Sequence, residues 1–154
     1  MNANAPLSPD GLARACADAM WKDDDASRGL GMQIVEVKAG QATLTMTVEP
    51  HMVNGQRIAH GGFIFTLADS AFAFACNGHN ERVVAAQGNI TFLRPGKLGD
   101  VLVAKAREIS RSGRSGIYDV QVTAGDVVIA EFRGHSRSIG GSWLPEPGTD
   151  ANQE

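Results

Sequence analysis

The sequence predicts an α+β fold in which an antiparallel sheet of five to six strands wraps around one long central helix. The helix is expected at residues 60–77, where proline is absent and apolar residues fall on nearly every side of a helix. The segments before and after it alternate apolar and polar residues with a period of two, which is typical of strands. A helix without a polar face has to be covered, and a wrapped sheet covers it.

Residues 1–27 are expected to form a lead and a short helix ahead of the main domain. Ser8 followed by Pro9 predicts the helix start, because serine caps free N–H groups and proline fits the first helical position. The acidic run at residues 23–25 is interpreted as a solvated turn that closes this helix. Residues 1–7 are expected to be disordered.

Two strands joined by a tight turn at Gly40 are predicted before the long helix. In the second strand Leu44, Met46 and Val48 face one way and threonines face the other, the pattern of a half-buried strand. In the first strand, alternate residues are expected to share one face: Met32, Ile34, Glu36 and Lys38. Residues 51–59 are expected to form a loop that leads into the helix.

Four further strands are predicted after the helix, separated by short breaks rich in glycine, serine and charged residues. They are expected at residues 83–92, 101–109, 116–122 and 127–132, the last running on toward residue 138. Because the connections are short, we predict that these strands pair in sequence as an antiparallel meander. The domain is thus expected to cover residues 28–139, and residues 140–154 are expected to form a flexible tail.

Composition excludes several classes of protein. At 154 residues with a net charge of −3, the chain fits one domain and lacks the basic surplus that nucleic-acid binding requires. No signal peptide is visible, and the apolar helix is too short for a membrane span and carries a carboxylate. Cys16 and Cys76 have no metal-like spacing. We therefore expect a cytoplasmic protein with no metal, no nucleic-acid partner and no membrane association.

Asp69 is the most informative residue of the predicted helix. Its neighbours at helical spacing are mostly apolar: Phe65, Thr66, Phe72 and Ala73. A carboxylate in such surroundings is costly unless it is paired, hydrogen-bonded or kept for chemistry. The residues alone leave two interpretations open, a catalytic carboxylate and a structural one at a subunit interface.

Several short motifs lie in and around the long helix. They are Asn54-Gly55, His60-Gly61-Gly62, Leu67-Ala68-Asp69, the segment 71–77, Phe92-Leu93-Arg94-Pro95 and Ser112-Gly113-Arg114. Together they resemble the hotdog-fold phenylacetyl-coenzyme A (CoA) thioesterases of the PaaI family, from about residue 24 through residue 137. The resemblance implies a hotdog fold and hydrolysis of phenylacetyl-CoA or a hydroxylated phenylacetyl-CoA. CoA then enters as part of the substrate, and no separate cofactor is expected.

Thioester hydrolysis needs an attacking group and donors for the oxyanion, and four residues are candidates. Asp69 can act as a general base on water or attack the carbonyl directly, and the sequence leaves both mechanisms open. The backbone N–H of Gly61, at a helix N-terminus, suits the oxyanion. The amide of Asn54 can hold the water or the carbonyl, and His60 is given a supporting role. The simpler readings are close packing for Gly61 and an ordinary turn for Asn54.

The spacing of these residues predicts a site shared between subunits. Gly61 and Asp69 are eight residues apart on one helix, which corresponds to about 12 Å along its axis. A reacting carbonyl has to lie about 3 Å from both its oxyanion donor and its attacking group. Asp69 is therefore expected to come from the second subunit of a two-fold dimer. The family resemblance implies the same arrangement, with dimers that commonly pair into a homotetramer.

A local surplus of basic residues is the expected trace of CoA phosphates. Between residues 94 and 137 there are eight basic and five acidic residues. Arginines in loops with accessible N–H groups suit phosphate. The preferred contact candidates are the loop residues Arg111, Ser112, Gly113 and Arg114, followed by Arg94 and Lys97. A hairpin with solvated charges is the alternative.

Two other functions fit the same fold. A hotdog acyl-thioester hydratase or dehydratase needs a histidine and a carboxylate that converge on the acyl chain, but His60 and Asp69 are nine residues apart. The proline-rich histidine motif typical of that class is also missing. A non-catalytic acyl-CoA sensor usually carries a nucleic-acid-binding domain, and the first 25 or so residues are too few and too acidic for one. The thioesterase reading is therefore preferred.

Overall fold

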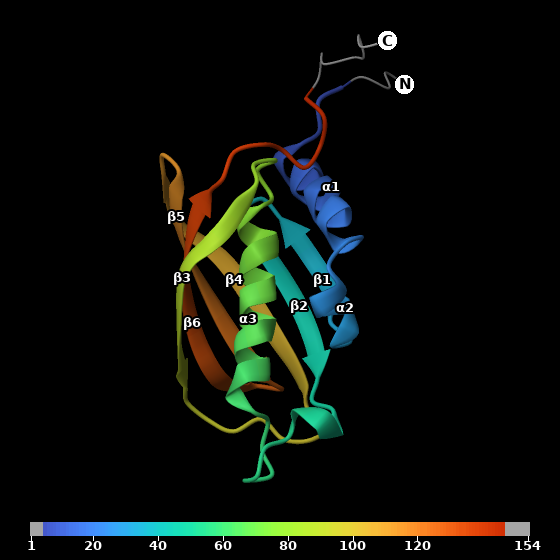
Figure 1. Ribbon diagram of the computed structural model, residues 1–154, viewed down its shortest axis with the longest axis vertical. Helices are drawn as coiled ribbons and strands as arrows, with labels where there is room; N and C mark the ends of the chain where they lie inside the picture. Colours follow the sequence, from blue (N-terminus) through green and yellow to red (C-terminus); the bar gives the residue numbers. More distant parts are fainter. Residues whose placement is uncertain (1–4, 147–154) are drawn as a thin grey trace.

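The computed structural model describes residues 5–146, and helix α3 (Gly61–Cys76) lies at its centre (Figure 1). Within these residues one six-stranded antiparallel sheet, in the order β1-β2-β4-β5-β6-β3, curls around α3. The strands are β1 Gln33–Lys38, β2 Gln41–Thr47, β3 Val83–Phe92, β4 Val101–Ser112, β5 Ser115–Ala124 and β6 Val127–Ser138. The other helices are α1 Pro9–Trp21, α2 Asp25–Gly29 and the short 3-10 helix η1 Pro50–Met52. The predicted α+β fold, six strands around one long helix, is confirmed.

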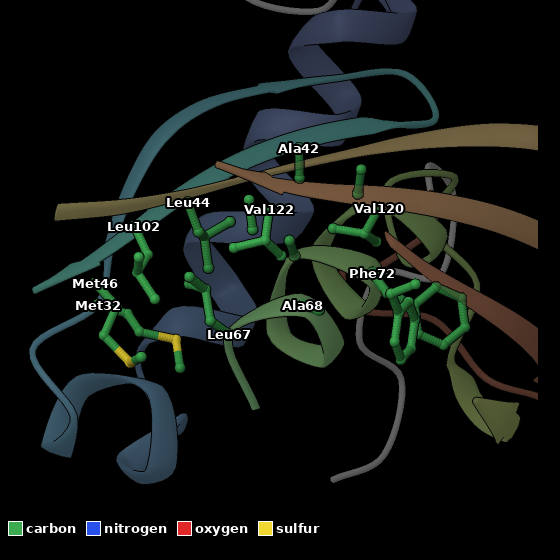
Figure 2. Packing of buried hydrophobic residues seen from close by; sticks show 14 of the residues in the cluster. Met32, Ala42, Leu44, Met46, Leu67, Ala68, Phe72, Leu102, Val120 and Val122 are labelled. Carbon is green, nitrogen blue, oxygen red and sulfur yellow. The ribbon is translucent and has the colours of Figure 1, made fainter. Parts of the chain in front are cut away.

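The hydrophobic core lies between α3 and the concave face of the sheet (Figure 2). Leu67, Ala68 and Phe72 project from the helix and are almost fully buried. The sheet contributes alternate residues of its middle strands: Ala42, Leu44, Met46, Leu102, Val120 and Val122. Each large apolar side chain buried in this way contributes about 1.5–3 kcal/mol. The alternation predicted for residues 44, 46 and 48 is confirmed.

One stripe of α3 is not covered, so the expectation that this helix is buried on nearly every side is wrong for the single chain. The sheet covers one side of α3 and leaves partly or fully exposed residues along the other: Gly62, Phe65, Thr66, Asp69 and Ala73. Their spacing of three or four residues places them on one line along the helix. The open line is apolar apart from Thr66 and Asp69.

Strand β3 does not pair with β4, so the predicted meander is correct only for β4, β5 and β6. β3 instead pairs antiparallel with β6, from Val83 opposite Ser138 to Phe92 opposite Ala130. Residues 93–100 then run past the N-terminal end of α3 to reach β4, which is separated from β3 in the sheet by β6 and β5 (Figure 1). Eight extended residues span about 26 Å, which is enough to cross the strands in between. The short connection between β3 and β4 therefore does not make these two strands neighbours in the sheet.

The acidic run is more than a solvated turn. Helix α1 begins as predicted, with the hydroxyl of Ser8 accepting from the N–H of Gly11 at 3.0 Å. Asp24 then caps a second helix, α2, by accepting from the N–H of Ser27 at 2.9 Å. The sequence prediction missed α2 because it has only five residues.

A bulge in β1 overturns the strict alternation predicted for that strand. The register against β2 shifts between Ile34 and Glu36. As a result Val37 is buried, whereas Val35 is 57% exposed. One extra residue in a strand turns the following side chains to the opposite face.

No helix within residues 5–146 is both long enough and apolar enough to cross a membrane.

Gly134 is expected to be essential for packing. A Cβ atom at this position in β6 would lie 2.8 Å from two ring atoms of Phe72. That ring is fixed by Tyr118 and Phe132, at centroid distances of 5.6 and 5.9 Å. Gly134→Ala should therefore lower the free energy of unfolding by about 1–3 kcal/mol, measured by urea denaturation. Gly29→Ala is the matched control, because its added Cβ would have no atom within 4 Å apart from its chain neighbours and the backbone of its own helix. Equal midpoints for the wild type and Gly134→Ala would contradict this packing.

Candidate active site

The N-terminus of α3 is fixed by His60. This residue is the helix N-cap, and its side-chain Nδ1 accepts a hydrogen bond from the N–H of Gly62 at 2.9 Å. The next residue, Gly61, opens the helix and lines a cleft of about 540 Å³ together with Asn54, Phe92 and Arg94. Helix N-termini present N–H groups and positive potential, so this cleft suits an oxygen that becomes negatively charged. His60 thus orients the helix end.

Gly61 also has a packing role. A Cβ atom here would lie 2.8 Å from Cζ of Phe92, which comes from β3. The absence of a side chain lets the Phe92 ring approach the helix start. The two interpretations of this glycine, close packing and N–H presentation, therefore both fit the same position.

Asn54 closes the turn that precedes the helix. Its side-chain Oδ1 accepts from the N–H of Gln56 at 3.0 Å and from the N–H of Ile58 at 3.3 Å. Its backbone N–H donates to the carbonyl of Ile58 at 2.9 Å. Because Oδ1 is occupied by the turn, the side-chain NH₂ is the group that can donate to a bound molecule. Asn54 thus serves as a turn residue and lines the same cleft as Gly61.

Asp69 lies in a different cleft. It is half-buried on the open stripe of α3, in a cleft of about 420 Å³ whose lining includes Phe72, Arg82, Val84 and Trp143. Burial raises the pKa of its carboxyl above the ordinary value, and among the described residues no hydrogen bond or ion pair lowers it again. An unpaired carboxylate in apolar surroundings is available as a base or nucleophile.

One chain therefore does not bring the candidate catalytic residues together. Asn54 and Gly61 line the cleft at the start of α3, and Asp69 lines the cleft in its second half. His60 belongs to the first group through its contact with Gly62. Gly61 and Asp69 lie on one continuous helix, so their eight-residue spacing corresponds to about 12 Å along the axis of α3.

Ser70, the residue after Asp69, contacts helix α2 through its side chain. Its Oγ lies 2.8 Å from Oγ of Ser27, which is 1% exposed. Ser27 in turn donates to Asp24 Oδ2 at 2.7 Å. These bonds attach the missed helix α2 to α3 at the residue next to Asp69. The acidic run thus supports the helix that carries Asp69.

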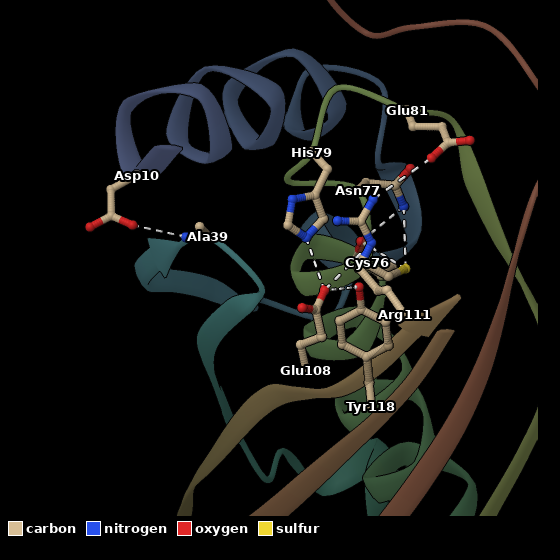
Figure 3. A network of polar contacts seen from close by, with 10 residues as sticks. Asp10, Ala39, Cys76, Asn77, His79, Glu81, Glu108, Arg111 and Tyr118 are labelled. Atoms are coloured by element: carbon tan, nitrogen blue, oxygen red, sulfur yellow. Dashed lines mark hydrogen bonds and ion pairs between the residues drawn. The ribbon is translucent and has the colours of Figure 1, made fainter. Parts of the chain in front are cut away.

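Arg111, a preferred phosphate candidate, is already paired with two carboxylates (Figure 3). Its Nη2 lies 4.0 Å from Oε2 of Glu81, and its Nε lies 3.7 Å from Oε1 of Glu108. Glu108 Oε1 also accepts from Tyr118 at 2.8 Å and lies 2.9 Å from Nε2 of His79. Much of the charge of Arg111 is therefore balanced within the chain.

The rest of that loop forms the turn between β4 and β5. Ser112 is the last residue of β4, and Gly113 follows with a positive φ of 57°. Arg114 Nη2 donates to the carbonyl of Ser138 at 3.1 Å. The loop is thus a tight hairpin.

Arg94 and Lys97 belong to the connection between β3 and β4, which passes the start of α3 at the opposite end of the molecule from the β4–β5 hairpin (Figure 1). Arg94 lines the cleft of Gly61, and its Nη1 donates to the carbonyl of Val128 at 2.8 Å. The backbone N–H of Lys97 donates to Asp100, and its side chain is exposed. Arg94 thus lies in the same cleft as the candidate oxyanion donor, and Lys97 follows it three residues later in the chain. No group of three or more metal-ligating side chains gathers within residues 5–146.

Sequence reasoning missed the residues that wall the Asp69 cleft from outside α3. Trp143, Arg82 and Met20 all line it. Trp143 falls in the segment expected to be a flexible tail, yet its indole N–H donates to Asn77 at 2.8 Å. A tryptophan in an otherwise polar segment was the available signal.

The remainder of the expected tail, residues 147–154, and residues 1–4 of the expected lead lie outside the described residues. The domain boundaries stay a prediction.

Asp69→Asn is expected to stabilise the fold at neutral pH. Burial makes the Asp69 pKa higher in the folded than in the unfolded chain, where it is near 3.9. Between those two values the folded chain binds more protons, so stability falls as pH rises through this window and the loss persists above it. The variant should therefore melt at a higher temperature than wild type at pH 7, with the difference shrinking below about pH 4. Exposed Asp126→Asn is the control; a lower melting temperature for Asp69→Asn at pH 7 would contradict the argument.

The chain is similar in sequence to known thioesterases. The model of the thioesterase superfamily matches residues 56–131. Acyl-coenzyme A thioesterase PaaI of Escherichia coli strain K12 is 42% identical over 127 residues, covering 82% of this chain and 91% of that protein. Human acyl-coenzyme A thioesterase 13 is 30% identical over 132 residues, covering 82% of this chain and 94% of that protein.

Solved structures of related proteins resemble this chain in fold. The E. coli PaaI protein from the phenylacetic acid degradation operon superposes with a TM-score of 0.86 at 40% identity, covering 88% of this chain and 99% of that chain. Smu.793 of Streptococcus mutans UA159, solved bound to acetyl CoA, gives a TM-score of 0.69 at 28% identity. The match covers 72% of this chain and 90% of that chain. The hotdog fold implied by the motifs is thereby confirmed. The chain belongs to the thioesterase superfamily and is an acyl-CoA thioesterase of the PaaI type.

Proposed function

We propose that this enzyme hydrolyses phenylacetyl-CoA or a ring-hydroxylated phenylacetyl-CoA to the free acid and CoA, at a site shared by two subunits. The observation that carries the proposal is the separation of Asp69 from Gly61 into two clefts on one chain. A thioester carbonyl can reach both groups only if a second copy supplies one of them. The cytoplasm is the proposed location.

The open surfaces of the chain support a two-fold dimer. β3 is an edge strand of the sheet, and its Val84 and Phe92 are 46% and 50% exposed. An exposed apolar edge invites pairing with another strand. The uncovered stripe of α3, which carries Asp69, is also apolar for most of its length. Two copies related by a two-fold axis would cover both surfaces and bring each Asp69 toward the partner's helix start. Such dimers are proposed to pair further into a homotetramer.

The proposed chemistry needs only groups of the protein and water. Asp69 either removes a proton from the attacking water or attacks the carbonyl carbon itself and forms a mixed anhydride that water then hydrolyses. The Gly61 N–H stabilises the oxyanion, and the side-chain NH₂ of Asn54 assists at the carbonyl or the water. The C–S bond breaks, and the CoA thiolate leaves and takes up a proton. Both routes require ionised Asp69.

A single turnover in ¹⁸O-labelled water detects a mixed anhydride that opens at the Asp69 carbonyl. If Asp69 activates water, the product acid carries the label from the first turnover. If Asp69 attacks directly and the anhydride opens at the Asp69 carbonyl, the first product acid carries an unlabelled oxygen from the carboxylate and the enzyme gains the label. Mass spectrometry of the product acid and of the peptide that contains residue 69 measures the ¹⁸O content of each.

The two clefts are proposed to hold different parts of the substrate. Arg94 and Lys97, beside the Gly61 cleft, are the proposed phosphate contacts. Arg111 and the hairpin residues through Arg114 are the second choice, because Arg111 is already paired with Glu81 and Glu108. The apolar Asp69 cleft is proposed to take the acyl group.

Thiol release from a panel of acyl-CoA compounds tests the proposed function. We expect turnover of arylacetyl-CoA thioesters with a higher kcat/KM than acetyl-CoA. Conversion of an enoyl-CoA without thiol release would instead identify a hydratase. Tight binding with no turnover of any thioester would identify a sensor, and either result would refute the proposal.

A further inference from the structure

The segment after β6 turns back across the end of α3 and forms a strap, defined here as residues 139–144 (Figure 1). Two asparagines near the end of α3 hold it. The indole N–H of Trp143 donates to Asn77 Oδ1 at 2.8 Å. The backbone N–H groups of Trp143 and Leu144 donate to Asn80 Oδ1 at 3.1 and 2.9 Å. The strap is therefore attached by side chains that lie more than sixty residues earlier in the chain.

Arg82 fixes the strap from the other side. Its backbone N–H donates to the carbonyl of Gly141 at 3.0 Å, and its Nε donates to the carbonyl of Ser142 at 3.0 Å. Its guanidinium lies over the ring of Trp143, 4.2 Å from the ring centroid. A cation over an aromatic face is an attractive arrangement. The indole is thus held between Arg82 and Asn77, in one position.

Trp143 lines the same cleft as Asp69. That cleft follows α3 from Asp69 toward Asn77, a distance of about 12 Å along the helix axis. Because the indole is bonded to Asn77, it stands at the end of the cleft away from Asp69. The walls between them are mostly apolar, and they include Phe72 and Cys76.

The chemistry of this cleft suits an aryl or alkyl group. Arg82 is the one cationic residue among those that line the cleft. Its guanidinium already donates to the strap backbone and lies over the indole. Burial raises the pKa of the Cys76 thiol to about 12, so the thiol stays neutral and adds no charge. The cleft measures about 420 Å³, whereas a cavity of about 150 Å³ holds a benzene ring. The cleft therefore has room for at least one aryl ring and a short linker.

We propose that Trp143 is a specificity-determining residue that forms the end wall of the acyl pocket and limits how far an acyl group extends from the thioester carbonyl. The inference rests on the proposed function, because it takes the acyl group to lie in the cleft of Asp69. It adds that the strap, which lies outside the six strands and α3, selects the substrate by length.

The test compares phenylacetyl-, 3-phenylpropionyl- and 4-phenylbutyryl-CoA as substrates of the full chain. Trp143→Ala should raise the ratio of kcat/KM for 4-phenylbutyryl-CoA over phenylacetyl-CoA at least tenfold, because it opens the end of the cleft. Trp143→Phe should change the ratio less. Trp21→Phe is the matched control, since Trp21 packs on Phe74 at 6.0 Å and lines a different hollow, and its ratio should equal that of wild type.

A parallel fall in all three kcat/KM values, with the ratio unchanged within twofold, would overturn the inference and leave Trp143 a structural residue. Should Trp143→Ala fail to fold, the Trp21→Phe chain, in which Trp143 is the one tryptophan, decides the matter. Phenylacetate should shift or quench its emission in a saturable way, and unchanged emission would overturn the inference. Absence of thiol release by wild type would refute the proposed function instead, so the two failures are distinguishable.

Discussion

Asp69→Asn is expected to lower kcat for thioester hydrolysis by about 10²- to 10⁴-fold, the contribution of a positioned base or more. The amide keeps the size of the carboxylate but can neither take a proton from water nor form an anhydride. Because burial raises the Asp69 pKa, wild-type activity should also fall at a higher pH than an ordinary aspartate would give, as acid neutralises the carboxylate. Thiol release with a saturating substrate across a pH series measures both effects.

The control for this substitution is Asp126→Asn in the turn between β5 and β6, where the side chain is exposed. It should retain the kcat and pH profile of wild type. A melting temperature of Asp69→Asn at or above that of wild type at pH 7 excludes unfolding as the cause of its loss of activity. Activity of Asp69→Asn within tenfold of wild type would rule out both mechanisms proposed for the carboxylate.

Mixing two inactive chains is expected to restore activity if subunits share the site. One chain carries Asp69→Asn and the other Asn54→Asp, which keeps the oxygen that caps the 54–58 turn but removes the NH₂ donor. Each alone should lose at least about tenfold in kcat. In a mixed dimer both substitutions fall in one site and the other site is intact. Random 1:1 mixing makes half of the dimers mixed, so about one quarter of wild-type activity should return.

Native mass spectrometry establishes whether mixed dimers have formed. If each site used Asp69 and Asn54 of the same chain, every site in the mixture would carry one defect and no activity would return. Mixed dimers without regained activity would therefore exclude a shared site.

Local patterns were sufficient to predict the helix and most of the sheet. The Ser8 cap and the period-two pattern of β2 depend on neighbours a few residues away, and so does the helix start at His60. These features appear in the structure where the sequence placed them. The eight-residue spacing of Gly61 and Asp69 likewise translated directly into two separate clefts, because it depends only on helix geometry.

Features that depend on distant residues could not be predicted in the same way. The pairing of β3 with β6 joins segments separated by β4 and β5, and a short connection gave the wrong neighbour. The local surplus of basic residues predicts that Arg111 is free to bind a phosphate. In the structure Glu81, thirty residues earlier in the chain, pairs with it. Trp143 was placed in a loose tail because its partners Asn77 and Asn80 are remote in sequence. Long-range hydrogen bonds and ion pairs thus determine the features that sequence periodicity does not predict.

The most direct test of the shared site is a crystal structure of Asp69→Asn with phenylacetyl-CoA bound. We expect the thioester oxygen to lie about 2.7–3.1 Å from the N–H nitrogen of Gly61 in one subunit, with the side chain at position 69 of the other subunit facing the carbonyl carbon. The aryl ring should lie between that side chain and Trp143. A thioester contacted by residue 69 and Gly61 of one chain, or bound away from both, would contradict the account.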